Sequence, residues 1–121
     1  GDRLGSKAPR IFYVNWFRKN HDGRFLWPGF SDNSRALKWM CERIDGKVGA
    51  KKSAIGLLPV DRNLDLNGIG LSTENIEELM KVDFKEWKAE IPDIEKHFAV
   101  FGNRLPERLK KQLKELAERL G

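Results

Sequence analysis

Apolar residues show two different spacing patterns along the chain. Residues 11–17 read Ile-Phe-Tyr-Val-Asn-Trp-Phe, an almost unbroken apolar run rich in β-branched and aromatic side chains. Such a run favours a buried strand. Asp22 and Gly23 then predict a turn, because glycine adopts the positive φ that tight hairpins require. Residues 24–27 are expected to form the return strand, so the pattern predicts a small β-hairpin over residues 11–27.

Farther along, apolar residues three and four positions apart predict helices. The first expected helix covers residues 34–45, because N-cap residues precede it and Gly46 follows it. Residues 54–60 are expected to be extended. Ser72 is expected to cap a short helix that ends near residue 80. The predicted apolar face of the first helix consists of Leu37, Met40, Cys41 and Ile44.

The last third of the chain has the strongest helical pattern. Asp83 and Glu86 have the spacing of a capping box, and an amphipathic helix is expected after them, with a kink or break at Pro92. A final helix is expected to begin near Pro106. The predicted apolar faces are Phe84, Trp87, Ile91, Ile94, Phe98 and Phe101, then Leu105, Leu109, Leu113, Leu116 and Leu120. These patterns predict an α+β fold, a small β-hairpin region followed by four or five helices.

Composition favours one soluble globular segment. The chain has 121 residues, of which 40% are hydrophobic and 34% charged, and no stretch approaches the length of a membrane span. No initiator Met or signal sequence is present, so we expect residues 1–121 to be a single excised fragment. Cys41 is the only cysteine, which favours a reducing, cytoplasmic compartment. Residues 1–60 hold 12 Lys and Arg against 5 Asp and Glu, a balance that suits an anionic partner or is simply solvated surface charge.

Three phenylalanines, Phe17, Phe25 and Phe30, lie within fourteen residues of one another. A planar base stacks well on aromatic rings. After Phe30, the predicted helix start offers backbone N–H groups without intrahelical partners, and Asn33 carries both an amide donor and an acceptor. The residues alone leave a second interpretation open, in which the rings are core side chains and Asn33 is a plain N-cap.

Two segments here have an unusual composition: Ile11-Phe12-x-Val14-Asn15-Trp16-Phe17-Arg18-Lys19, and Gly23-x-Phe25-Leu26-Trp27-Pro28-Gly29-Phe30-x-x-Asn33-Ser34-Arg35. Together they resemble the nucleotide-base segment of the GTP-dependent phosphoenolpyruvate carboxykinases. Shorter stretches up to residue 96 are similar as well. The chain is thus similar to the C-terminal segment of that family, part of a larger nucleotide-binding C-terminal domain.

The resemblance implies a role for six residues in binding guanine. In that family three phenylalanines hold the base, and the residues around the helix start contact its edge. The corresponding residues here are Phe17, Phe25, Phe30, Ser31, Asp32 and Asn33. Ser31 and Asp32 replace a glycine and a glutamate that are common in the family. The implied parent is a decarboxylating lyase of gluconeogenesis or anaplerosis, which converts oxaloacetate and GTP to phosphoenolpyruvate, GDP and carbon dioxide with manganese or magnesium.

The resemblance also implies what lies elsewhere. The family's phosphate loop, metal ligands and oxaloacetate-binding arginines belong to the upstream part of a longer chain. We therefore expect no catalytic residue and no metal ligand here, and no activity of the fragment alone. His21 is expected to be a turn residue, His97 a helix-surface residue and Cys41 a core residue. The expected partners are a guanine nucleotide and the remainder of the parent enzyme, not a membrane. Nucleic acid is not an expected partner. Two alternatives are nevertheless a single-stranded nucleic-acid-binding module and a structural interaction domain.

Overall fold

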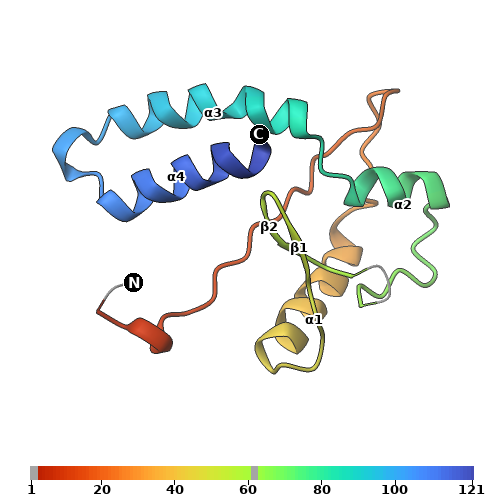
Figure 1. Ribbon diagram of the computed structural model, residues 1–121. Coiled ribbons are helices and arrows are strands. Elements are labelled where there is room, and N and C mark those ends of the chain that lie inside the picture. The colour runs from red at the N-terminus through yellow and green to blue at the C-terminus, as the bar shows by residue number, and fades with distance from the viewer. Residues whose placement is uncertain (1–2, 61–62) are drawn as a thin grey trace. The chain divides into compact units, whose positions relative to one another are not determined.

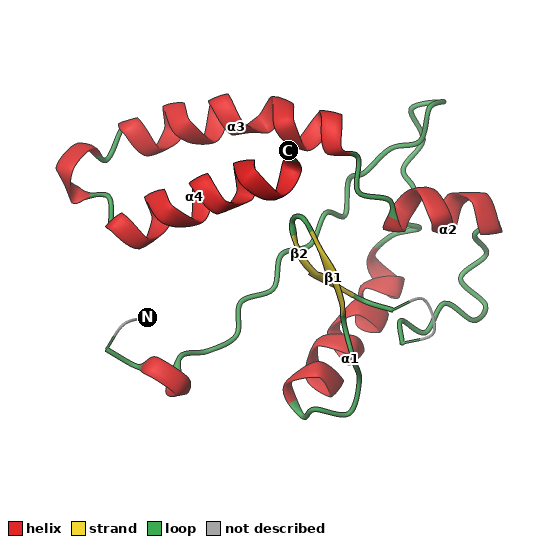
Figure 2. Ribbon diagram, viewed as in Figure 1, coloured by secondary structure: helices red, strands yellow, loops and turns green. Residues whose placement is uncertain are grey.

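A computed structural model describes residues 3–60 and 63–121 of the chain. Figure 1 shows the order of the elements, and Figure 2 separates helices from strands. The chain divides into two compact units. One comprises Gly1–Lys51 and Pro59–Met80, and the other Lys52–Leu58 and Lys81–Gly121. The two units are described separately below, and together they confirm an α+β fold.

The first unit contains helix α1 (Asn33–Ile44) and helix α2 (Thr73–Met80). Two single turns of 3-10 helix, Gly5–Lys7 and Phe30–Asp32, lie in the same unit. The first helix thus begins one residue before its predicted start, preceded by the 3-10 turn. Ser72 caps α2 as expected, because its side-chain oxygen accepts a hydrogen bond from the amide of Asn75 at 3.2 Å.

The hairpin predicted over residues 11–27 is wrong in extent. Residues 11–17 form no strand, and the only pairing in this segment is an isolated antiparallel bridge between Lys19 and Phe25. The segment nevertheless keeps the alternation of a strand, since every second side chain from Phe12 to Trp16 is half-buried while Ile11 and Tyr13 are almost fully exposed. No other described segment forms a hydrogen-bonded ladder with residues 11–17, and an extended run without a paired neighbour is not a strand.

The core of the first unit is small. It consists of the buried residues Leu26, Trp27, Trp39, Leu64 and Ile69. Trp39 is the buried residue of α1, and its indole packs edge-on against Phe12, with ring centroids 6.0 Å apart. The predicted apolar face of this helix is therefore displaced. Leu37, Cys41 and Ile44 are exposed, so the expectation that Cys41 is a core residue is wrong.

The second unit holds the sheet, a two-stranded hairpin of β1 (Lys51–Ser53) and β2 (Gly56–Leu58). The hairpin follows α1, whereas the sequence pattern placed it before the first helix. Ser53 donates its hydroxyl to the carbonyl of Gly56 at 2.8 Å and so closes the turn. The Arg119 side chain donates to the carbonyl of Ala54 at 2.7 Å, which ties this turn to the last helix.

Helices α3 (Phe84–Ala99) and α4 (Glu107–Leu120) lie side by side as an antiparallel pair (Figure 1). A single 3-10 turn, Gly102–Arg104, connects them. The Asp83 carboxylate accepts hydrogen bonds from the amides of residues 85 and 86, which confirms it as the N-cap of α3. The helix continues through Pro92 without the break that the sequence left open. Leu105 and Leu120 are buried, so part of the leucine face is core.

Candidate base-binding site

A tight turn carries the aromatic residues of the candidate site. The amide of Leu26 donates to the carbonyl of Arg18 at 2.8 Å, and the amide of Asn20 donates to the carbonyl of Arg24 at 2.9 Å. The side-chain oxygen of Asn20 accepts the amides of Asp22 and Arg24 at 3.0 and 2.9 Å, respectively. An asparagine that bonds its own downstream backbone stabilises a turn locally. This turn therefore stays closed without a flanking sheet.

The turn brings two of the three candidate phenylalanines together. The rings of Phe17 and Phe25 lie 6.1 Å apart in an edge-to-face arrangement, with an interplanar angle of 65°. Aromatic pairs favour this geometry because the positive edge of one ring faces the negative face of the other. The Lys19 ammonium lies 5.1 Å from the centre of the Phe25 ring, a distance at which a cation attracts a ring face. The site therefore contains a preformed aromatic pair with a positive charge beside it.

All three candidate rings are exposed, whereas their sequence neighbours are not. Phe17, Phe25 and Phe30 are 74%, 58% and 92% exposed, and Leu26 is only 1% exposed. The backbone thus buries the residue next to Phe25 and leaves the phenylalanines uncovered. Clustered exposed aromatic side chains are typical of a binding surface. The interpretation of these rings as core side chains is wrong for this chain.

Phe30 stands at the opposite end of the segment, at the start of the 3-10 turn. It follows Gly29, whose φ of 136° and ψ of −164° lie in a region that only glycine adopts easily. Among the described residues, no ring contact joins Phe30 to Phe17 or Phe25. The structure therefore brings together two of the three predicted rings, and the third remains separate and exposed.

The residues at the helix start are already engaged with one another. Asp32 accepts a hydrogen bond from the Arg35 guanidinium at 2.8 Å, and Arg35 also donates to the carbonyl of Asp65 at 2.8 Å. The amides of Asp32 and Asn33 donate to the carbonyls of Gly29 and Phe30 within the 3-10 turn. The expectation of free backbone donors at these two positions is therefore wrong, because a 3-10 turn precedes the α-helix and uses them. Ser31 is exposed.

Trp27 connects the turn to the helix start. Its ring packs against Trp16, with centroids 5.6 Å apart, and its indole nitrogen donates to the side-chain oxygen of Asn33 at 2.8 Å. Trp27 was not among the residues expected in the site. The sequence carried one signal for this contact. Trp27, whose side chain can only donate, stands six residues before Asn33, whose side-chain oxygen can accept, and Pro28 and Gly29 between them favour a bend.

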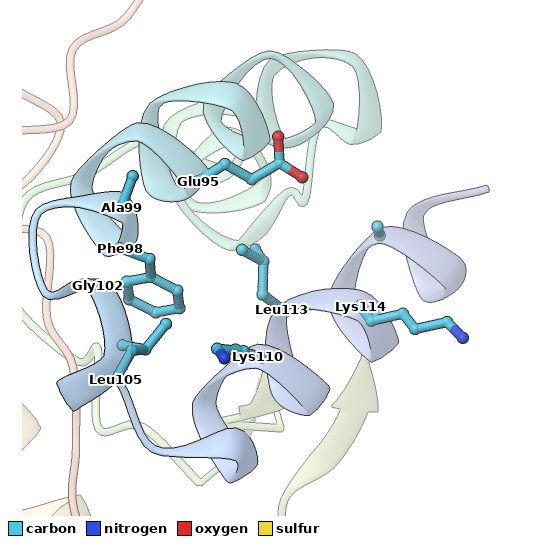
Figure 3. Close-up of a pocket in the computed structure, with 9 residues that line it drawn as sticks. Glu95, Phe98, Ala99, Gly102, Leu105, Lys110, Leu113 and Lys114 are labelled. Carbon is cyan, nitrogen blue, oxygen red and sulfur yellow. The ribbon is translucent and has the colours of Figure 1, made fainter.

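Two cavities lie outside the turn of residues 18–26, which we call the aromatic turn. Between α3 and α4 there is an open cavity of about 470 Å³, and Figure 3 shows Phe98, Leu105 and Leu113 directed into it. A more polar cavity of about 670 Å³ lies in the first unit beside Leu64 and Asn67. Within residues 3–60 and 63–121 no three His, Cys, Asp or Glu side chains are placed to hold a metal ion. Over the same residues, no helix is long and apolar enough to cross a bilayer.

Comparison with known proteins gives the class of this chain. Residues 1–119 match the family described as the phosphoenolpyruvate carboxykinase C-terminal P-loop domain. The chain belongs to this family, and the resemblance seen in its aromatic segment is thereby confirmed.

The similar proteins are phosphoenolpyruvate carboxykinases (GTP). The chain is 48% identical over 114 residues to that of Arthrobacter sp. (strain FB24), an alignment that covers 94% of this chain and 19% of the relative. It is 47% identical over 124 residues to that of Treponema pallidum (strain Nichols), covering 98% of this chain and 20% of the relative. The chain thus spans about a fifth of the length of the curated relatives it matches.

Proposed function

We propose that this chain is the guanine-binding segment of a GTP-dependent phosphoenolpyruvate carboxykinase. The observation that carries the proposal is the exposed edge-to-face pair of Phe17 and Phe25, held on a hydrogen-bonded turn next to the start of α1. Family membership over residues 1–119 supports the choice of a nucleotide as the ligand.

In the proposed site each residue has a defined task. Phe17 and Phe30 stack on the two faces of the base, and Phe25 closes one side of the pocket with its ring against Phe17. Asn33 and the neighbouring residues Ser31 and Asp32 face the base edge. Because Phe30 follows a glycine with an unusual backbone conformation, rotation about that bend is the means by which its ring approaches the base.

The parent reaction would be the conversion of oxaloacetate and GTP to phosphoenolpyruvate, GDP and carbon dioxide. The described residues do not fit the manganese or magnesium ion that this reaction uses, so no step of it is assigned to them. The remainder of the parent enzyme is the proposed partner of the whole segment. A lone cysteine is typical of a reducing compartment, and we therefore place the parent in the cytoplasm.

Oxaloacetate-dependent formation of phosphoenolpyruvate by this chain with GTP and manganese should stay at background. Turnover above background would refute the proposal that catalysis needs the remainder of the parent enzyme.

The expected affinity of the isolated chain is low. Two stacking contacts contribute about 1–3 kcal/mol each, and one or two hydrogen bonds about 0.5–1.5 kcal/mol each. The loss of ligand freedom subtracts about 5 kcal/mol or more. The net free energy of binding is therefore at most about 4 kcal/mol, which corresponds to a dissociation constant of about 1 mM or weaker. GTP, GDP and guanosine should bind within about tenfold of one another, since the bound part is the base.

An NMR titration of the ¹⁵N-labelled chain with guanosine and adenosine tests the proposal. Guanosine should shift the backbone signals of Phe17, Phe25 and Phe30 at lower concentration than adenosine does. The variant Phe30→Ala should lose these shifts, because one wall of the site is removed. Equal shifts with both nucleosides, or shifts that map away from the three phenylalanines, would refute the proposal. Salt-dependent binding of a single-stranded oligonucleotide in place of guanosine would favour the nucleic-acid alternative.

A further inference from the structure

A side-chain hydrogen bond joins Trp27, which follows the aromatic turn, to Asn33, the first residue of α1. The Trp27 side chain is 7% exposed, and its indole nitrogen lies 2.8 Å from the side-chain oxygen of Asn33. An indole nitrogen only donates, whereas an amide side chain both donates and accepts. The amide oxygen must therefore face Trp27, and the amide nitrogen must point the other way.

This contact decides what Asn33 offers to a ligand. Its side chain is half-buried, and its amide nitrogen has no hydrogen-bond partner among residues 3–60 and 63–121. An Asn33 side chain that is free to turn over can bind either a donor or an acceptor on a base edge, because its amide oxygen accepts and its amide nitrogen donates. With the oxygen oriented toward Trp27, the side chain directs its N–H donors away from Trp27.

We propose that Trp27 is a positioning residue that fixes Asn33 as a hydrogen-bond donor and thereby gives the pocket its preference for 6-oxopurines. The inference rests on the proposed function. The 6-oxo group of guanine or hypoxanthine accepts the amide N–H. The 6-amino group of adenine donates and would face a second donor, which leaves both groups unpaired. Selectivity therefore comes from a residue that does not touch the base.

Trp27→Phe and a matched control test the inference. Trp27→Phe removes the indole N–H and keeps an aromatic ring, so the Asn33 amide becomes free to turn over. Trp39→Phe makes the same change at a residue that is 6% exposed and whose indole nitrogen has no hydrogen-bond partner in the part of the chain that the structure describes. The probes are GMP, IMP and AMP, whose common phosphate cancels in the comparison, and binding is measured by NMR titration.

The wild-type chain and Trp39→Phe should bind GMP and IMP about tenfold more tightly than AMP, whereas Trp27→Phe should bind all three within about twofold. Unchanged selectivity in Trp27→Phe would overturn the positioning role and leave the proposed function intact. An equal loss in both variants would overturn it too, because the effect would be general destabilisation. A wild-type chain without preference for GMP would refute the proposed function, and the inference with it.

A measurement without ligand keeps the inference testable if Trp27→Phe does not fold. Asn33→Ala should shift the indole N–H resonance of Trp27 and leave that of Trp39 in place, and an unmoved Trp27 resonance would show that the hydrogen bond is absent. Asn33→Asp keeps an oxygen for Trp27 and presents a second oxygen to the base. This variant should therefore favour AMP over GMP and IMP. A retained preference for GMP would contradict the proposal that residue 33 recognises the group at position 6 of the purine.

Discussion

Replacing Leu26 by alanine removes the most buried side chain of the described residues. Leu26 is 1% exposed and lies between Phe25 and Trp27, and its amide is bonded to the carbonyl of Arg18. Truncation of a buried leucine to alanine costs about 2–5 kcal/mol, because the transfer free energy is lost and a cavity remains. Folded proteins of this size are stable by about 5–15 kcal/mol in total, so the loss is a large fraction.

The control is Leu37→Ala, at a leucine of α1 in the same unit whose side chain is 55% exposed. A surface truncation of this kind changes stability by about 0.5 kcal/mol or less. Both variants lose the same atoms. The difference between them therefore isolates burial from side-chain chemistry.

Urea unfolding followed by tryptophan fluorescence measures the difference. Three of the four tryptophans, Trp16, Trp27 and Trp39, lie in the same unit as Leu26, so the signal reports mainly on that unit. With an unfolding slope of about 1–3 kcal/mol per molar urea, Leu26→Ala should lower the midpoint by about 0.5 M or more relative to Leu37→Ala. Midpoints within about 0.3 M of each other would refute the assignment of Leu26 as the centre of this core.

Three further changes have defined outcomes. Gly29→Ala should destabilise the chain by about 1–3 kcal/mol in urea unfolding, because the conformation of Gly29 is costly for alanine although open space surrounds it, while Gly49→Ala should be neutral or stabilising. Hydrogen bonds from the amides of Glu86 and Lys85 hold the pKa of the Asp83 carboxyl below its ordinary value. The Asp83 cap therefore stabilises α3 above about pH 4, and this stabilisation is lost as the pH falls further. Circular dichroism should show an acid loss of helix that is smaller in Asp83→Ala than in the wild type, and an unchanged acid transition would contradict the cap. Arg18→Lys should lower stability by about 1 kcal/mol, because the guanidinium bonds two groups at the end of α2, and an unchanged urea midpoint would contradict that role.

The helices were predictable from sequence because their signals are local. Asp83 caps α3 through backbone amides two and three residues away, and the leucines of α4 repeat within single turns. The strands were predictable only in part. The expectation that residues 54–60 are extended is met by β2 (Gly56–Leu58). Residues 11–17 have the composition of a strand but form no ladder with another described segment, whereas β1, with the sequence Lys-Lys-Ser, has little strand signal and pairs with β2 across the turn that joins them.

The candidate site also combines features that were predictable from the sequence with features that were not. The rings of Phe17 and Phe25 were named from the sequence, and their contact follows from the turn between them. The buried side of α1 was placed wrongly, because Trp39 is larger than its neighbours and fills the core next to Phe12, which a count of apolar positions does not reveal. The bond from Trp27 to Asn33 depends on the bend between them, and a bend of that kind is fixed only by the full backbone.

Two kinds of exposed apolar side chain are present in the first unit, and the difference between them bears on binding. Ile11 and Tyr13 lie on a segment without a hydrogen-bonded ladder, whereas Phe17 and Phe25 lie on a turn closed by backbone and side-chain bonds. Ordering a mobile side chain on binding costs about 0.5–1.5 kcal/mol, which is comparable to what a single weak stacking contact contributes. Rings held before the base arrives avoid that cost. In the proposed site, the buried residues next to the rings, Leu26 and Trp27, would therefore contribute to affinity by holding Phe17 and Phe25 in place before the base binds.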